Sequence, residues 1–247
     1  TDAAYCYDGT FKGFLCCIFE SYARHEIPAA VLPPEQGQLT LFGCTNIETD
    51  EEKARRVAAG LARQGMLVQD RITTGFLSDA PEKDLILLRF ARLCFTHGAA
   101  TAQMLGDTDV AAAFALERAV SNEAHQFIEF IRFEQRGDML GAVIHPKARV
   151  LPLLRAHFCS RLPDENFLIF DATHGVAMLR RQGRLDYLAM EHYIPEPDEA
   201  ELDWQSLWKR FFKALTIEER RNPRCQMTHV QKRFWRDMLE MQAETQV

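Results

Sequence analysis

The period at which apolar residues recur changes along this chain, near residue 127. Before that point the spacing is helical, as in the i, i+3, i+4, i+7 series of apolar residues between Phe11 and Tyr22. After it come short runs typical of strands, "NFLIFDA", "VAMLRR" and "RLDYLAM", joined by tight turns. The change predicts an α+β protein with an N-terminal helical half followed by an antiparallel sheet of about five strands flanked by helices.

Capping residues and turns set the expected element boundaries. We expect a hairpin from "FIEFIRFEQ", starting at Phe127, and "MLGAVIH", and a short extended piece at "LTLFG". The predicted helices are about Thr10 to Arg24, Thr49 to Gln64 with "TDEE" as its capping box, "KDLILLRFARLCF", a helix capped by Asp107 or Thr108, "KARVLPLLRAHFCSRL", and two closing helices near residues 203–215 and 228–241.

Length and composition indicate a chain that folds on its own. With 247 residues and 47% apolar composition it can form one compact domain over 1–247, or be subdivided into a mainly helical part, 1–126, and a sheet with C-terminal helices, 127–247. Neither a run of eighteen apolar residues nor a signal peptide is visible in the sequence. We therefore expect a cytoplasmic protein without a membrane association.

The seven cysteines are an odd number, and none of them forms a C-x-x-C pair. Most lie in apolar contexts, which favours reduced, buried thiols over a disulfide framework or a structural zinc site. The eight histidines form no H-E-x-x-H motif. The sequence thus predicts no metal site and no cofactor.

Charge is strongly segregated although the net charge is -6. The stretch 191–203 holds six carboxylates and no Lys or Arg, and its proline-bearing part, 194–201, is an expected linker. In contrast, 209–236 holds nine basic residues against two acidic ones. A second basic stretch, 141–163, holds four cations and no carboxylate. Such segments suit phosphate contacts, with an aromatic side chain stacking on an unpaired base, but they also occur as solvated surface charge. The predicted nucleic-acid contacts are Arg132, Arg155, Arg161, Arg220, Arg221, Arg224, Lys232, Arg233 and Trp235.

Three ionisable residues are candidates for acid or base catalysis. Glu123 and His125 lie in "SNEAHQFIEFIRF", but residues two apart on a helix do not share a face, so they are a poor metal pair. Asp171 lies in "FDATHG" beside a hydroxyl and an imidazole. The alternatives are a buried structural network around Glu123 and His125 and an ordinary hairpin turn at Asp171.

The stretch "YDGTFKGF", 7–14, joins an expected strand to an expected helix. It matches neither the phosphate-loop nor the dinucleotide-loop pattern. Gly9 and Thr10 would still direct free N–H groups and the positive end of the helix dipole at one spot, which suits an anion. The alternative is simple capping of the helix.

Several segments together resemble a bacterial family of putative DNA repair or probable DNA metabolism proteins. The domain of unknown function that defines this family also occurs fused ahead of a uracil-DNA glycosylase domain. The resemblance implies a companion radical SAM protein with an iron–sulfur cluster, acting in DNA modification or repair, and it implies no catalytic residue. The segments are "YDGTFKGFLCCIFE", "TDEEKARRV", "NEAHQFIEFIRFE", "HPKARVLPLLRAHFCSRLP", "FLIFDATHGVA" and "IEERRNPRCQMTHVQKRFWRDMLE".

The leading hypothesis is therefore a DNA-binding accessory protein that presents distorted or single-stranded DNA to the radical SAM partner. One competing hypothesis is a hydrolase acting on nucleic acid, nuclease or glycosylase-like, that uses Glu123, His125 or Asp171. Another is a non-catalytic scaffold whose basic tail meets an acidic partner surface. Whether the chain is an enzyme stays open at this stage.

Overall fold

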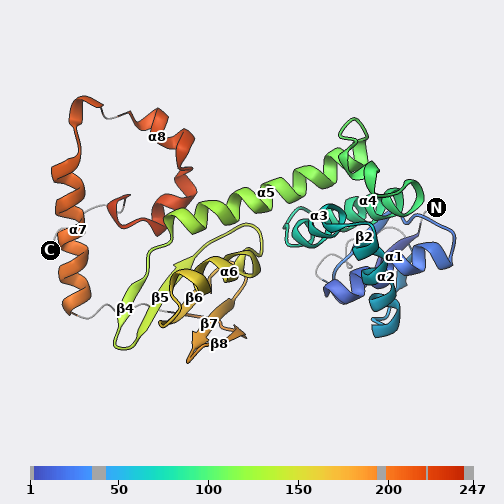
Figure 1. The fold of residues 1–247 in the computed structure, drawn as a ribbon, viewed down its shortest axis with the longest axis horizontal. Helices are drawn as coiled ribbons and strands as arrows, with labels where there is room; N and C mark the ends of the chain where they lie inside the picture. Colours follow the sequence, from blue (N-terminus) through green and yellow to red (C-terminus); the bar gives the residue numbers. More distant parts are fainter. Residues whose placement is uncertain (1–2, 35–42, 194–198, 221, 242–247) are drawn as a thin grey trace. The chain divides into compact units, whose positions relative to one another are not determined.

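The computed structural model describes residues 3–34, 43–193, 199–220 and 222–241 (Figure 1). The chain folds into two compact units, residues 1–121 and 122–247. The expected α+β class is confirmed, with helices preceding the larger sheet. Most of "LTLFG" and residues 194–198 of the expected linker lie outside the described residues.

The first unit holds a small parallel sheet with strand order β2-β1-β3 and several helices. The strand before α1 was expected, but its parallel pairing with β2 and β3 was not, because strands of three residues are too short to show a period. The helix α3 was not predicted either. The elements are β1 (Ala4–Cys6), α1 (Phe11–Ala23), β2 (Ala30–Leu32), β3 (Cys44–Asn46), α2 (Glu51–Arg63), α3 (Met66–Phe76), α4 (Lys83–His97), the 3-10 helix η2 (Ala99–Gln103) and the beginning of α5 (Thr108–Phe130).

The expected first helix is confirmed as α1. Its cap is Thr10, whose Oγ1 accepts a hydrogen bond from the Gly13 N–H at 3.0 Å. One face of α1 is fully buried and packs with β1, α2 and α4 in a continuous apolar core that includes Phe14, Ile18 and Phe90. Burial of this face holds the first unit together.

Two expectations for the first unit were wrong. The cap of α2 is Asp50, which accepts from the N–H groups of Glu52 and Lys53, while Thr49 donates its hydroxyl to Asp8 at 2.7 Å. Because the Thr49 hydroxyl is bound to Asp8, the Asp50 carboxylate takes the cap and accepts from both N–H groups. Cys6 and Cys44 form a disulfide, because adjacent strands bring their Cα atoms to 6.0 Å.

The second unit is built on a sheet of strand order β4-β5-β6-β7-β8. Three of the strands match "NFLIFDA", "VAMLRR" and "RLDYLAM", and the turn between the last two contains Gln182 and Gly183 at positive φ. Its elements are the end of α5, β4 (Glu134–Arg136), β5 (Met139–Ile144), α6 (Leu151–Arg161), β6 (Asn166–Asp171), β7 (Val176–Arg181), β8 (Arg184–Ala189), α7 (Glu199–Leu215), η3 (Glu218–Arg220), α8 (Pro223–His229), η4 (Lys232–Asp237) and η5 (Leu239–Met241).

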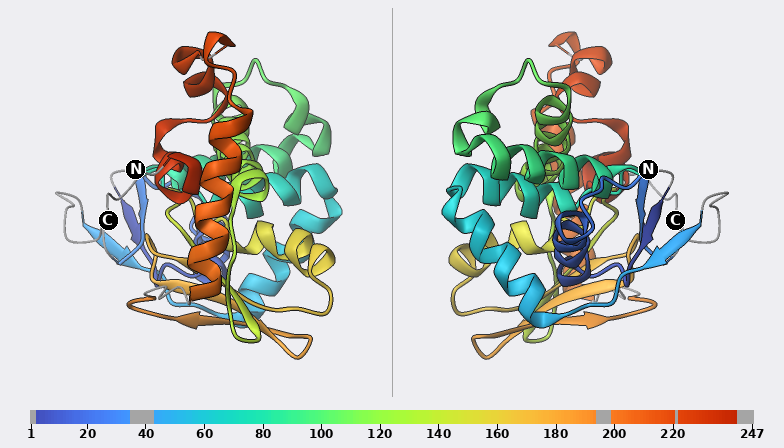
Figure 2. Two further views of the ribbon diagram at one scale, coloured as in Figure 1. Left: turned by 90° about the vertical axis from the view of Figure 1, so that its left-hand side faces the viewer. Right: turned by 90° about the vertical axis from the view of Figure 1, so that its right-hand side faces the viewer.

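The sheet is mixed, so the expectation of a purely antiparallel sheet was wrong. β5 and β6 pair in parallel, with Ile144 opposite Asp171, because α6 carries the chain back between them. Figures 1 and 2 show α6 on one face of this sheet. Phe133 packs edge-on against Phe158 of α6 and Phe167 of β6, at 5.3 and 6.1 Å between ring centroids. The face of β6 that α6 covers therefore carries apolar side chains.

Two further boundaries differ from expectation. The strand expected from Phe127 starts only at Glu134, because α5 continues to Phe130. A short apolar run fits both the helical and the strand period, and this run is helical. The last expected helix, 228–241, is instead α8 followed by 3-10 turns. Asn222 starts α8 early by accepting from the Cys225 N–H, and Val230 is extended.

None of the helices in the described ranges combines the length and the hydropathy that a membrane span requires.

Candidate nucleic-acid interface

Two loops meet where the parallel strands β5 and β6 end. The loop 145–150 follows β5, and the turn 172–175 follows β6. They lie side by side because the Ala172 N–H donates to the Ile144 carbonyl at 3.0 Å. The carboxyl edge of parallel strands is where open α/β sheets commonly bind ligands. This edge is therefore a candidate functional site of the second unit.

Glu123 fastens the first of these loops. Its side chain is 4% exposed, Oε1 accepts from the Lys147 N–H at 2.9 Å, and Oε2 accepts from the Ala148 N–H at 2.8 Å. Nη1 of Arg233 donates to Oε1 as well. Both carboxylate oxygens are thus occupied, which favours an anchoring role over acid or base catalysis by Glu123.

The same contact brings the two basic segments of the sequence together. Lys147 and Ala148 belong to the segment 141–163, and Arg233 belongs to the segment 209–236. Next to the polar contact, Phe127 and Phe234 pack edge-on at 5.0 Å between ring centroids. Glu123 of α5 therefore binds both basic segments, and the Phe127 contact packs the second segment against α5.

The exposed cations of these two segments are free of carboxylates. Among the described residues, none of them forms an ion pair with Asp or Glu. Unpaired surface cations keep their full attraction for an external polyanion. They are Lys147, Arg149, Arg155, Arg161, Arg210, Lys213, Arg220, Arg224 and Lys232.

Asp171 lies at the adjacent turn and is also buried. Its Oδ1 accepts from the N–H groups of Thr173 and His174 at 3.0 and 3.1 Å, and its Oδ2 lies 2.6 Å from Nδ1 of His174. The His174 side chain is 8% exposed. A carboxylate on Nδ1 fixes the orientation of an imidazole and leaves Nε2 as its reactive nitrogen.

Residues 81–240 match the model of a domain of unknown function, DUF4130. The chain belongs to this family. No curated protein and no solved structure matches it.

The DUF4130 match contains Glu123, both basic segments and the Asp171 turn. It starts at Pro81, so β1 to β3 and α1 to α3 lie outside it. The candidate surface around Glu123 thus lies within the DUF4130 region.

Two arginines predicted to bind phosphate are instead bound to buried carboxylates within this region. Arg233 is bound to Glu123 and lies over the ring of Phe234 at 4.4 Å. Arg132 is 2.7 Å from Oε1 of Glu201, a buried carboxylate of α7. The buried Nε of Arg132 has no acceptor among the described residues. Both arginines hold elements together, so their guanidinium groups are engaged within the protein.

The remaining predicted residues of the DUF4130 region are more scattered. Trp235 is half-buried and donates Nε1–H to the Val230 carbonyl at 3.0 Å, and Arg221 lies outside the described residues. The His125 side chain is 71% exposed and lies 3.1 Å from Glu129 on the next turn of α5. Glu129 is helical, so its expected place on a strand was wrong. His125 and Glu123 take different faces of α5, as their spacing predicted.

Glu201 is a buried anchoring residue that the sequence did not reveal, because it is one of six carboxylates in the acidic stretch 191–203. It accepts from Arg132, from the Gln135 N–H at 3.3 Å and from Gln205 at 3.1 Å. Burial and the nearby Glu201 raise the pKa of Glu134. The contacts fix α7 beside β4.

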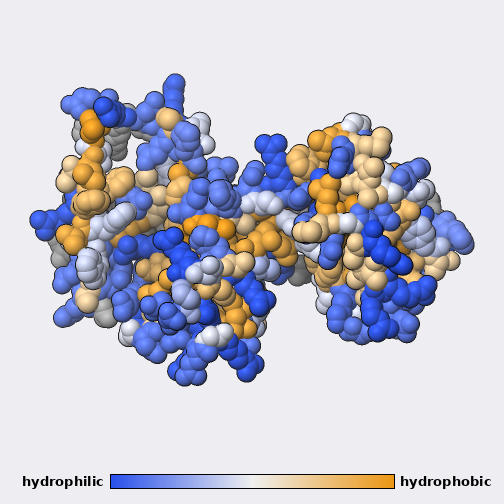
Figure 3. All heavy atoms as spheres, in the orientation of Figure 1, coloured by the Kyte–Doolittle hydropathy of each residue, from blue (hydrophilic) through white to orange (hydrophobic). Residues whose placement is uncertain are grey.

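α7 also exposes an apolar face, visible along this helix in Figure 3. A groove of about 480 Å³ runs between α7 and the strands β4 and β5. Trp204 and Phe211, which line it, are 65% and 52% exposed. Aromatic side chains with this exposure are typical of protein interaction surfaces. The exposed apolar side chains of α7 are Leu202, Trp204, Leu207, Trp208, Phe211, Phe212 and Leu215.

The anion site predicted at Gly9 and Thr10 of the first unit is occupied by the Asp8 side chain. The Thr10 N–H donates to Oδ1 of Asp8 at 2.9 Å, and the Thr10 hydroxyl donates to the same oxygen at 2.7 Å. Burial disfavours the Asp8 carboxylate, but the hydrogen bonds of Thr49 and Thr10 outweigh it and lower its pKa. An anion placed here would meet this negative charge, so the geometry favours capping.

Proposed function

We propose that this chain binds DNA, distorted or single-stranded, as an accessory protein in DNA repair or modification. The observation that carries the proposal is Glu123, which joins two basic segments far apart in the sequence and leaves their outer cations unpaired. Phosphates would contact Lys147 and Arg149 on one segment and Arg220 and Arg224 on the other.

The proposal predicts binding that depends strongly on salt. Fluorescence anisotropy of a labelled single-stranded oligonucleotide, measured at two salt concentrations, gives both the affinity and the salt slope. We expect Lys147→Ala with Arg149→Ala, and Arg220→Ala with Arg224→Ala, each to weaken binding and to lower the slope by about 2.

The matched control is Arg184→Ala. This cation of β8 is 82% exposed in the same unit but lies outside both segments and pairs with Asp186 at 3.1 Å. It should leave the slope unchanged. If both double variants bind as the wild type does, the proposed surface is wrong.

The partner of this activity is proposed to be a radical SAM protein, docked on the apolar face of α7. That face carries large exposed rings beside a groove, which suits a protein partner better than a phosphate backbone. Co-purification of the two proteins should be lost with Trp204→Ser and Phe211→Ser. Retention of the complex in this double variant would exclude the α7 face as the docking site.

A second candidate function is hydrolysis of nucleic acid, favoured by the 2.6 Å contact between Asp171 and His174. His174 would act as general base through Nε2, oriented by Asp171. Turnover of damaged oligonucleotides by the isolated protein should then be lost in His174→Gln and kept in His125→Gln, whose imidazole is exposed. Absence of any turnover by the wild type removes this candidate.

A further inference from the structure

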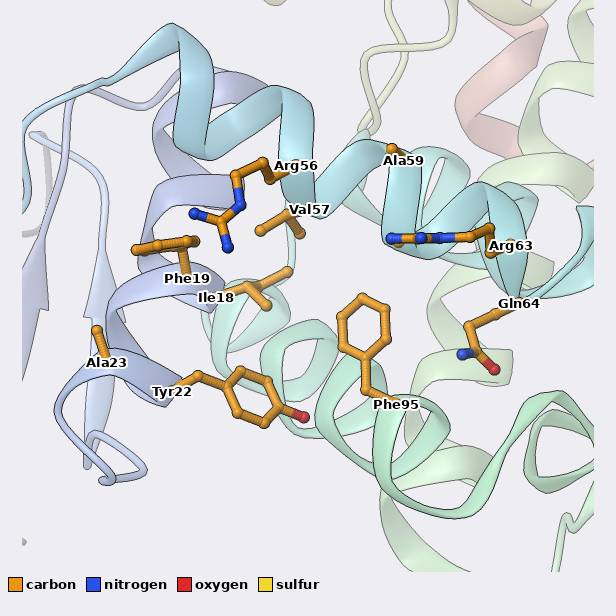
Figure 4. Close-up of a pocket in the computed structure, with 11 residues that line it drawn as sticks. Ile18, Phe19, Tyr22, Ala23, Arg56, Val57, Ala59, Arg63, Gln64 and Phe95 are labelled. Carbon is orange, nitrogen blue, oxygen red and sulfur yellow. The ribbon is translucent and has the colours of Figure 1, made fainter.

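An open cavity of about 800 Å³ lies in the first unit between α1, α2 and α4 (Figure 4). Its size falls in the range of about 300–1,000 Å³ that small-molecule sites occupy. The wall is mostly apolar, with Ile18 and Val57 at its base and three aromatic rings around it. The rings belong to Phe19, Tyr22 and Phe95.

The rings are held in place before any ligand arrives. Tyr22 and Phe95 pack edge-on at 6.2 Å between centroids, and the guanidinium of Arg92 lies 4.2 Å over the Tyr22 ring. Arg92 is itself fixed by the carbonyl of Ser21 at 2.8 Å. A Cβ at Gly60 would lie 3.1 Å from the Phe95 ring, so the glycine lets this ring rest against α2. Fixed rings lose little freedom when a flat group stacks on them.

The charge at this cavity is positive and unmatched. Arg56 and Arg63 extend from α2 at its rim, as Figure 4 shows. Within the described part of the chain neither guanidinium is hydrogen-bonded or ion-paired; Arg56 lies only over the Phe19 ring, at 5.2 Å. No described residue of the lining carries a carboxylate. The nearby Glu20 is neutralised by Lys53 at 2.8 Å and Arg24 at 3.2 Å.

Two arginines around aromatic rings fit an anion that carries a flat ring. An arginine fork binds phosphate in a defined geometry, and an aromatic wall stacks on any base. Gln64, also in the lining, offers an amide that can donate to and accept from a base edge. An aliphatic acid would need a closed apolar tunnel instead, and this cavity is open.

We propose that this cavity binds a nucleotide, with the base against Tyr22 and Phe95 and the phosphate on Arg56 and Arg63. The site is separate from the basic segments of the second unit and does not depend on the function proposed for them. The same chemistry could come from a free nucleotide or from an unpaired nucleotide within a strand.

The test uses the full chain and two fluorescent probes, 2-aminopurine deoxyriboside 5′-monophosphate and an oligothymidylate decamer with one central 2-aminopurine. Stacking on an aromatic ring quenches 2-aminopurine fluorescence, so binding appears as saturable quenching. We expect Arg56→Gln with Arg63→Gln to weaken binding at least about tenfold, and Phe95→Leu to reduce the quenching at saturation.

Arg55→Gln is the matched control, since this cation of α2 is 76% exposed, lies outside the cavity and pairs with Glu52 at 3.8 Å. It should bind as the wild type does. Arg220→Ala with Arg224→Ala should also keep the quenching by the mononucleotide, which separates this proposal from the DNA surface. Thermal unfolding of each variant checks that it folds.

Quenching of the monophosphate assigns a free nucleotide, and quenching of the decamer alone assigns a nucleotide within a strand. Either result supports the site if the arginine pair is required. The proposal is overturned if the arginine double variant binds both probes as the wild type does, if neither probe binds, or if decanoate displaces the monophosphate at a lower concentration than AMP does.

Discussion

The two units of this chain use buried carboxylates in different ways. In the first unit Asp84 is 2% exposed and accepts only from the Tyr7 hydroxyl at 3.0 Å; its buried Oδ1 has no partner among the described residues. Burial raises its pKa. In the second unit Glu123 accepts two backbone N–H groups and a guanidinium. One carboxylate is tolerated inside an apolar core, and the other connects segments.

The difference follows from the apolar contacts that each unit has available. The first unit surrounds its sheet with a continuous apolar core drawn from five helices. The C-terminal segment 222–241 of the second unit is a short helix with 3-10 turns and buries only Phe234, Met238 and Leu239 among its described side chains. A segment with so little apolar burial needs polar anchors to keep one position.

The largest expected loss of stability comes from a substitution on a buried helix face, compared with the same substitution on an exposed face. Phe14→Ala in α1 removes a ring that is 0% exposed and should lower the free energy of unfolding by about 3–5 kcal/mol. Phe211→Ala in α7, where the ring is 52% exposed, should change it by no more than about 0.5 kcal/mol. Urea unfolding followed by circular dichroism measures both.

A large loss in Phe211→Ala would show that the α7 face is covered within the isolated chain. It would then no longer be available to a partner protein, and the proposed docking surface would have to be abandoned.

The next effect tests whether Glu123 anchors the C-terminal segment. Glu123→Gln leaves Arg233 without a counter-charge and turns an amide N–H toward a backbone N–H, so we expect a loss of about 2–3 kcal/mol. Glu129→Gln, six residues later on α5 and 48% exposed, is the control and should be nearly neutral.

Hydrogen exchange locates this effect. Amides of residues 222–241 should lose protection in Glu123→Gln while those of α1 stay protected. Equal protection of the C-terminal segment in both variants would mean that its apolar contacts suffice, and the contrast between the units would disappear.

The sequence predicted local structure well and long-range pairing poorly. Thr10 as a cap and the Gln182-Gly183 turn follow from residues a few positions apart, and both are present. The Glu123 to Arg233 contact spans 110 positions. Neither periodicity nor composition indicates which cation a buried carboxylate selects, because the fold decides that.

The same reasoning explains the errors. β5 and β6 were expected to be antiparallel because the sequence shows strands but not their direction, and only the α6 crossover makes them parallel. The cavity of the first unit was missed for a related reason. Arg56 and Arg63 are seven apart on α2 and share its face, a signal that the sequence does contain, but the rings opposite them come from α1 and α4.

The smallest expected effect concerns Glu20, a surface carboxylate of the first unit and the opposite of Asp84 in its electrostatics. A hydrogen bond from Lys53 at 2.8 Å lowers the pKa of Glu20 below its ordinary 4.5, whereas burial raises that of Asp84. The stability from Glu20 is therefore fully present above about pH 4.5 and is lost as the pH falls through the lower pKa of the folded state. Asp84 acts in the reverse sense, and its contribution to stability declines as the pH rises through its raised pKa.

Glu20→Gln should cost a fraction of a kcal/mol at pH 7 and nothing at low pH, while Asp84→Asn should be at least as stable as the wild type at pH 7. Thermal unfolding between pH 3 and pH 7 compares the two slopes; parallel curves for both variants and the wild type would show that neither carboxylate is linked to folding of the first unit.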